Sequence, residues 1–339
     1  MLRKHFLQNL GLAGLSGGLF RTFLADEGTN EAFRFVHLTD SHVFDRRAGY
    51  EGYAKCVRSV NGLNPEPDFV MMGGDMVFDG MYNEKQDYIA WMRRFKELSD
   101  ELDMPWYPSM GNHDPYGWSS RRKSPADDPD LGKAMILNEF EWEAPYYSFD
   151  HKGWHFTVLD CIAPVEKEDG LSYAPMIDVK QLEWLAKDLG AAADKPKIVV
   201  VHVALFYLGH QAQGDKQSSA VSSNMHVQNN KEVREILERH GVKLVLQGHC
   251  HHLEFMEYNG VKYLTSGAAS GAWWAGNWKG NEEGFSVIHC NSDGTLSWSY
   301  QDFGWTAQLD DADTLERERK ATYDAFQADQ ARLRAKERG

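Results

Sequence analysis

Residues 33–42 read FRFVHLTDSH, an apolar and β-forming run that ends on Asp40 and His42. Four more polar motifs follow short apolar runs in the same way: Gly74-Asp75, Gly111-Asn112-His113-Asp114, Val201-His202 and Gly248-His249-Cys250-His251. The five runs are too short for stable helices and are rich in β-formers; they lie at 33–38, 69–72, 106–110, 198–201 and 244–246. Groups that follow parallel strands meet at the carboxyl edge of a sheet. The sequence therefore predicts an α/β fold in which five turns surround one point.

These turns offer oxygen and nitrogen ligands. Two carboxylates, one amide oxygen and four imidazoles suit iron, manganese or zinc, and no position requires a thiolate. Cys250 lies between two of the histidines, so on an extended segment its side chain points the other way, and we interpret it as packing. The pattern predicts a site for two divalent or trivalent transition metal ions.

The ordered set Asp-x-His, Gly-Asp, Gly-Asn-His-Asp, His and Gly-His-x-His resembles that of the calcineurin-like metallophosphoesterases, from about residue 34 to about residue 304. Each motif alone is common, and the order with its strand context makes the match specific. The resemblance implies a four-layer α-β-β-α sandwich of two mixed sheets with outer helices. It also implies the metal ligands: Asp40, His42 and His251 for one ion, Asn112, His202 and His249 for the other, and Asp75 as the bridge.

The same resemblance implies a reaction, the hydrolysis of a phosphoric ester by a hydroxide that bridges the two metals. Two divalent cations and two aspartates leave a net positive site that attracts a phosphate group. By resemblance His113 is not a ligand but donates a proton, or a charge-assisted hydrogen bond, to the departing oxygen. Asp114, next in the chain, is expected to orient that imidazole.

The motifs favour a phosphodiester over other substrates. The Asp-x-His form resembles the branch of cyclic-nucleotide and glycerophosphodiester phosphodiesterases. In purple acid phosphatases a tyrosine ligand usually follows the Gly-Asp motif, where this chain has Phe78. Protein Ser/Thr phosphatases carry arginine soon after the second and third motifs, where this chain reads Gly80-Met81 and Pro115-Tyr116.

Two alternatives remain open. A phosphomonoesterase is the nearer one, because the same metals act on both ester types; a non-catalytic scaffold is the other, although such scaffolds are expected to lose ligands. Arg46 and Arg47 follow the first motif and either clamp a phosphate oxygen, which would favour a monoester, or belong to a solvated loop. Natural substrate, metal identity and oligomeric state are not determined by the sequence.

Composition fits a single catalytic domain with a small substrate. The chain has 339 residues, of which 42% are hydrophobic, and a net charge of −14. So acidic a surface repels long nucleic acid, because phosphate-backbone binding needs basic patches. We expect a small phosphoester substrate, a catalytic domain at 30–305, and a charged helical tail at 306–339 that packs on the domain or forms an oligomer contact.

Residues 1–25 resemble an export signal. They combine a basic start at Arg3-Lys4 with a Gly- and Leu-rich stretch that is too short to span a bilayer. The start also resembles a twin-arginine signal, with Lys4 in place of the second arginine. The prediction is a periplasmic or extracellular protein, tethered to the membrane if the segment stays uncleaved.

Periodicity predicts the scaffold around the site. Helices are expected at 51–61, 84–102 and 179–189 and around 233–237, and hairpins at 146–160, 254–265 and 285–301. Segment 208–223 could be a lid. Trp273, Trp274 and Trp278 either stack on a base or sugar or pack against the sheet. His252 either touches the site or lies in a turn, His155 is interpreted as structural, and the four cysteines are expected to be free buried thiols.

Overall fold

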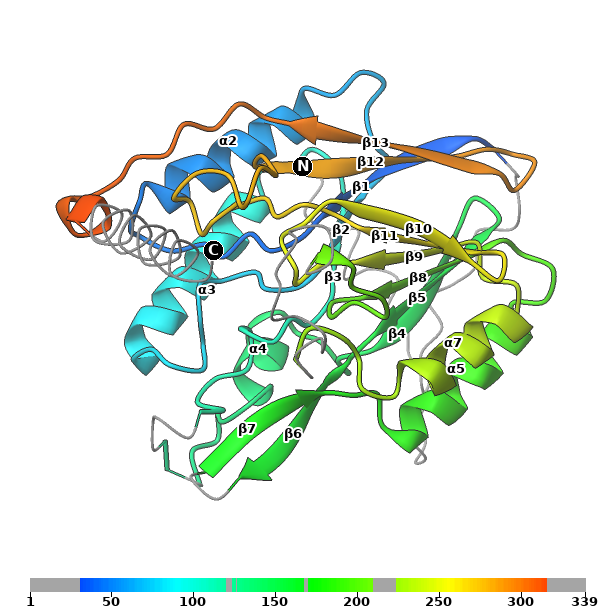
Figure 1. The fold of residues 1–339 in the computed structure, drawn as a ribbon, viewed down its shortest axis with the longest axis horizontal. Coiled ribbons are helices and arrows are strands. Elements are labelled where there is room, and N and C mark those ends of the chain that lie inside the picture. Colours follow the sequence, from blue (N-terminus) through cyan, green and yellow to red (C-terminus); the bar gives the residue numbers. More distant parts are fainter. Residues whose placement is uncertain (1–30, 120–123, 126, 168–169, 210–223, 316–339) are drawn as a thin grey trace, which may run out of the picture.

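The computed structural model describes residues 31–119, 124–125, 127–167, 170–209 and 224–315 (Figure 1). The signal-like segment at 1–25, most of the expected lid and the tail beyond residue 315 lie outside the described residues. Export therefore stays a prediction. No helix among the described residues is long and apolar enough to cross a membrane.

Two large mixed sheets form the centre of the molecule (Figure 1). The five-stranded sheet has the order β13 (Leu296–Asp302), β12 (Gly284–Cys290), β1 (Phe33–Leu38), β2 (Val70–Met72) and β3 (Trp106–Pro108). The six-stranded sheet has the order β10 (Glu254–Tyr258), β11 (Val261–Thr265), β9 (Leu244–Gln247), β8 (Lys197–Val201), β5 (Trp154–Leu159) and β4 (Tyr147–His151). Strands β1, β2 and β3 are parallel, as are β8 and β9. The five predicted strands thus form two parallel groups, one in each sheet.

Helices cover the outer face of each sheet. On the first sheet lie α2 (Gly49–Asn61) and α3 (Lys85–Ser99), and on the second α5 (Val179–Ala191) and α7 (Asn230–Arg239). Side chains alternate between the two faces along β8, and both faces are apolar. Val199 and Val201 pack in the cluster that holds the helix residues, whereas Ile198 and Val200 face the other sheet. The predicted four-layer sandwich is confirmed, and so are the predicted helices and hairpins, with small shifts of their ends.

Aromatic rings fill the space between the sheets. Phe35 of β1 stacks on Phe69 with ring centroids 4.8 Å apart, and both meet Phe156 of β5 edge-on at 5.4 and 5.3 Å. Phe149 of β4 stacks on Phe156 at 5.0 Å. Each such pair contributes about 0.5–1.5 kcal/mol beyond the burial of its surface. The two sheets are therefore held at a spacing that rigid rings define.

One hairpin and one short helix were not expected from the sequence. Strands β6 (Ile162–Lys167) and β7 (Gly170–Pro175) pair with each other outside both large sheets, and α4 (Ala134–Glu139) precedes them. The cysteines conform to expectation, because all four are free and buried.

A buried charge network ties α5 to the sheet, and it predicts a pH-dependent stability. His155 is 4% exposed, with Nδ1 2.8 Å from a carboxylate oxygen of Asp150 and Nε2 2.9 Å from one of Asp188. Burial alone would lower the pKa of His155, but the two carboxylates outweigh it and raise the pKa to about 9. Because the folded-state pKa exceeds the unfolded value, this stabilisation is complete below about pH 6.5 and is lost as the pH rises through about 9.

We therefore expect His155→Gln to lower the free energy of unfolding by about 3 kcal/mol at pH 6 and by much less at pH 10. Urea denaturation of both proteins at the two pH values measures the difference. His289→Gln is the control, since its imidazole has a pKa lowered by burial and carries no such network. A His155→Gln deficit of the same size at both pH values would show that the wild-type imidazole is not charged.

Candidate metal centre

Six of the candidate ligands lie in sharp turns at the carboxyl ends of four strands. Asp40 and His42 follow β1, Asp75 follows β2, His202 follows β8, and His249 with His251 follow β9. Five of these six have a positive φ: 54° at Asp40, 39° at His42, 51° at Asp75, 68° at His249 and 55° at His251. Non-glycine residues adopt this region at a cost of about 1–3 kcal/mol each, and such residues cluster at functional sites. The turns are thus bent so that alternate side chains point to one place.

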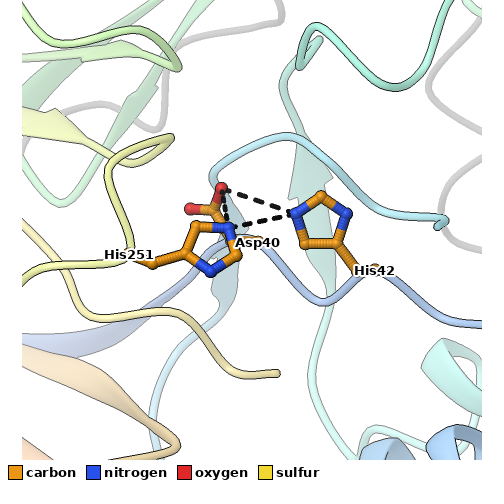
Figure 2. Close-up of side chains that lie close together, drawn as sticks. All are labelled: Asp40, His42 and His251. Carbon is orange, nitrogen blue, oxygen red and sulfur yellow. Dashed lines mark hydrogen bonds and ion pairs between the residues drawn. The ribbon is translucent and has the colours of Figure 1, made fainter. Parts of the chain in front are cut away.

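Asp40, His42 and His251 form the first candidate group, with ligand atoms within 4.8 Å of one another (Figure 2). Nε2 of His42 lies 3.1 Å from Nε2 of His251, and Oδ1 of Asp40 lies 4.0 and 3.4 Å from these nitrogens. All three side chains are buried. Two imidazole nitrogens that face each other at this distance need a proton or a cation between them, and a metal ion supplies one.

Asp75, His202 and His249 form the second group. Oδ2 of Asp75 lies 3.1 Å from Nε2 of His202 and 3.7 Å from Nε2 of His42, so the same oxygen faces both groups. Burial alone would lower the pKa of His202, but the charge of Asp75 raises it to about 10, and a bound cation would replace that proton. Asp75 therefore lies between the two groups.

Asn112 supplies the test of whether these residues fit metal ions. Its Oδ1 is buried and has no hydrogen-bond partner. Leaving a buried polar atom unpaired costs about 1–3 kcal/mol. A buried amide oxygen without a donor suits a cation, and the mixed nitrogen and oxygen set of the candidate ligands suits iron, manganese or zinc. The residues fit the metals that the sequence predicts.

Backbone carbonyls fix the orientation of the imidazoles. Nδ1 of His42 lies 3.2 Å from the carbonyl of Phe78, Nδ1 of His202 2.7 Å from that of Gly73, and Nδ1 of His251 2.5 Å from that of Gly271. These nitrogens donate, which leaves Nε2 free to bind a metal. His249 is reversed, because its Nε2 lies 2.9 Å from the carbonyl of Asn224 and leaves Nδ1 for the metal.

Asp114 does not orient His113, and that expectation is corrected. The Asp114 carboxylate accepts hydrogen bonds from the backbone N–H groups of Gly111 at 2.7 Å, Met76 at 2.9 Å and Asp75 at 3.0 Å. In this irregular turn, consecutive side chains point to different sides. Burial and the nearby charge of Asp75 raise the pKa of Asp114 to about 7. Its role is to fasten the turn after β3 to the turn after β2.

Asp79 takes the place expected of Asp114. Its Oδ2 lies 3.5 Å from Nδ1 of His113, while its Oδ1 accepts from the backbone N–H groups of Met81 and Tyr82. Burial alone would lower the pKa of His113, but Asp75 and Asp79 raise it to about 9. The His113 ring lies edge-on to the ligand His42, with centroids 5.0 Å apart, and reaches solvent. The sequence signal for Asp79 was an acid four residues after the Gly-Asp motif.

The two arginines after the first motif are held by the C-terminal segment. Arg46 pairs with Asp310 at 2.7 Å, and Arg47 donates to Asp313 and to the backbone carbonyl of Trp273 at 3.1 Å. Asp313 is 5% exposed despite its place near the end of the described chain. Arg46 forms its ion pair at the surface, with an exposed side chain, whereas Arg47 is largely covered.

Two further residues of the last motif pack instead of lining the centre. His252 is buried and stacks on Tyr207, with centroids 5.9 Å apart and planes at 8°. Cys250 is buried in a small cluster with Tyr207 and Ala204, which agrees with its interpretation as packing. Within the described residues, neither belongs to a candidate metal group.

Trp274 fastens the loop after β11 to the first ligand turn. Its ring is fully buried, and Nε1 donates to the backbone carbonyls of Ser41 at 3.1 Å and His42 at 3.2 Å. The indole reaches this position because α2 presents glycines: a Cβ at Gly52 would lie 2.4 Å from the Trp274 ring, and one at Gly49 3.0 Å. Of the two readings of Trp274, packing is the one that the structure shows.

Gly52→Ala should therefore displace Trp274 and disturb the turn that carries Asp40 and His42. We expect a loss of about 1–3 kcal/mol in the free energy of unfolding, from overpacking, together with weaker metal binding. Calorimetry and metal titration measure the two effects. Gly190→Ala is the matched control in α5, where the added Cβ meets only an atom of His240 at 3.6 Å and should leave both properties unchanged or slightly improved. Equal behaviour of the two variants would refute the role of the close contact.

Comparison with known proteins agrees with the geometry. The family model described as "Calcineurin-like phosphoesterase" matches residues 33–253. Human "Tartrate-resistant acid phosphatase type 5" is 26% identical over 73% of this chain and 75% of its own length. The "Probable glycerophosphodiester phosphodiesterase GpdQ" of Arcobacter nitrofigilis is 22% identical over 69% of this chain and 78% of its own. "3',5'-cyclic adenosine monophosphate phosphodiesterase CpdA" of Haemophilus influenzae is 24% identical over 69% and 76%. The chain belongs to the calcineurin-like phosphoesterase family, metal-dependent hydrolases of phosphoric esters.

Proposed function

We propose that this chain hydrolyses a small phosphodiester, with the two ligand groups holding two iron, manganese or zinc ions. Asp40, His42 and His251 would hold one ion and Asn112, His202 and His249 the other, with Asp75 between the two groups. Bound ions of this kind polarise phosphoryl oxygens and lower the pKa of a water towards neutrality. The remaining roles belong to the protein itself.

His113 is the proposed proton donor to the leaving oxygen. It is absent from both ligand groups of the described chain, lies beside His42, and has a pKa raised to about 9 by Asp75 and Asp79. A charged imidazole in this position can deliver its proton to a leaving oxygen. Asp79 orients the ring and maintains its charge, and Asp114 fastens the turns that carry Asp75 and Gly111.

A diester is chosen over a monoester because both arginines after the first motif are already ion-paired. A monoester dianion calls for extra side-chain cations, but Arg46 and Arg47 are engaged by Asp310 and Asp313. A monoesterase remains the second candidate, since the human relative is named as an acid phosphatase. We also propose a catalytic unit at 30–305, a charged helical tail at 306–339 that packs on it or forms an oligomer contact, and an exported protein.

The test is hydrolysis of bis(p-nitrophenyl) phosphate and p-nitrophenyl phosphate by protein that has been reconstituted with metal. We expect a higher kcat/KM for the diester. A higher kcat/KM for the monoester would assign the activity to a phosphatase. It would also imply that one of the two arginines leaves its aspartate to contact the substrate. No turnover of either compound by protein that holds two ions would favour the non-catalytic scaffold.

A further inference from the structure

Two partly exposed tryptophans stand beside the first ligand group. The Trp273 ring lies 4.6 Å from the ring of His251 and 5.4 Å from that of His42, measured between centroids. Trp278 lies edge-on to Trp273, with centroids 5.4 Å apart and planes at 86°, and 6.1 Å from His251. His42 in turn neighbours His113, the proposed donor to the leaving oxygen. We call Trp273 and Trp278 the aromatic wall.

The backbone of this wall is held in place from outside the loop. Trp273 and the buried Trp274 have φ values of 51° and 66°, two consecutive non-glycine residues in the left-handed region. Such a conformation persists only where the surroundings enforce it. Here Arg47, fixed by Asp313, donates to the carbonyl of Trp273, and Trp274 donates to the first ligand turn.

The other end of the wall is fixed to the last ligand turn. Trp278 and Asn281 exchange two backbone hydrogen bonds at 2.9 Å, and the side chain of Asn281 accepts from the N–H of Leu253, two residues after the ligand His251. The loop that carries the wall is thus tied to the first and the last ligand turns. These hydrogen bonds fix the two rings relative to the candidate ligands.

We propose that the aromatic wall stacks on a planar ring of the substrate, so that the natural phosphodiester carries a nucleobase or a similar flat group. This inference rests on the proposed function and adds the substrate class. Partly exposed indoles offer flat apolar faces, and stacking of one base on an aromatic side chain contributes about 1–3 kcal/mol. A quaternary ammonium group is the poorer occupant, because the Lys279 ammonium already lies 5.0 Å above the Trp278 ring and would repel it.

The test compares two diesters that differ in the ring. One is a 3',5'-cyclic nucleotide and the other is glycerophosphoethanolamine, which is aliphatic. For Trp278→Leu we expect kcat/KM for the cyclic nucleotide to fall about tenfold, mainly through KM, while that for the aliphatic diester changes less than about twofold. Trp278→Phe keeps a flat ring and should restore most of the loss. Trp298→Leu, a partly buried tryptophan of β13 that packs on Phe255, is the control.

A binding measurement separates stacking from catalysis. By titration calorimetry, Trp278→Leu should bind a nucleoside monophosphate about tenfold more weakly than the wild type and glycerol 3-phosphate equally well. Equal losses for both ligands, or for both diesters, would overturn the inference and leave the tryptophans as packing for the ligand histidines. A wild type that hydrolyses only the aliphatic diester would overturn it too. A wild type that hydrolyses neither, with two ions bound, would count against the proposed function itself.

Discussion

Asp75→Asn should lose at least one of the two metal ions and lower kcat by about a thousandfold, which is about 4 kcal/mol of transition-state stabilisation. The reason is the position of one oxygen: Oδ2 of Asp75 lies 3.1 Å from Nε2 of His202 and 3.7 Å from Nε2 of His42. Asparagine keeps the size of the side chain and removes its charge. Atomic emission gives the metal content per chain, and steady-state kinetics give kcat.

Asp293→Asn is the matched control for that substitution. Asp293 is exposed in the turn between β12 and β13, where its carboxylate accepts from the N–H and hydroxyl groups of Thr295. It should keep both ions and full activity. If Asp75→Asn also kept both ions and wild-type kcat, the bridging position of Asp75 would be wrong, and the two groups would have to be independent sites.

His113→Ala should lower kcat by about a hundredfold to ten-thousandfold while the metal content stays unchanged. The metal content should hold because His113 lies outside both ligand groups. The loss should be larger for an alkyl leaving group than for nitrophenolate, since a poor leaving group depends more on a proton. Kinetics with the two kinds of diester measure the ratio. A loss of equal size for both would show that His113 acts elsewhere than on the leaving oxygen.

Asp79→Asn provides the companion measurement. The Asp79 carboxylate helps to raise the pKa of His113, so its neutralisation should lower that pKa and shift the alkaline limb of the kcat profile to lower pH. If Asp79 were merely structural, the substitution would reduce kcat or stability without shifting the alkaline limb of the pH profile.

The parts of the fold that the sequence predicts are those with local signals. The five strands have apolar runs that end on polar turns, and α3 repeats buried residues at helical spacing, as Tyr88, Trp91, Met92 and Phe95 show. The hairpin of β10 and β11 turns at Asn259-Gly260, where both residues have positive φ. In each case neighbours in the sequence determine the structure, so the pattern is sufficient.

The parts that the sequence did not predict depend on distant or irregular contacts. Arg46 and Arg47 find partners 264 and 266 residues away, and nothing near them indicates those acids. Asp114 stands next to His113 in the chain, yet the turn after β3 sends its carboxylate to backbone amides and leaves Asp79 to face the imidazole. Adjacency in the sequence is a poor guide wherever the backbone is neither helix nor strand.

Each candidate metal group takes ligands from both sheets, and this makes the aromatic layer between them part of the active centre. The first group joins Asp40 and His42, which follow β1, to His251, which follows β9; the second joins Asp75 to His202 and His249. The separation of the two sheets thus sets the distance between the ligands that follow one sheet and those that follow the other. A change of ring size at Phe35 or Phe156 is therefore expected to shift the ligands of one sheet relative to those of the other without touching a ligand.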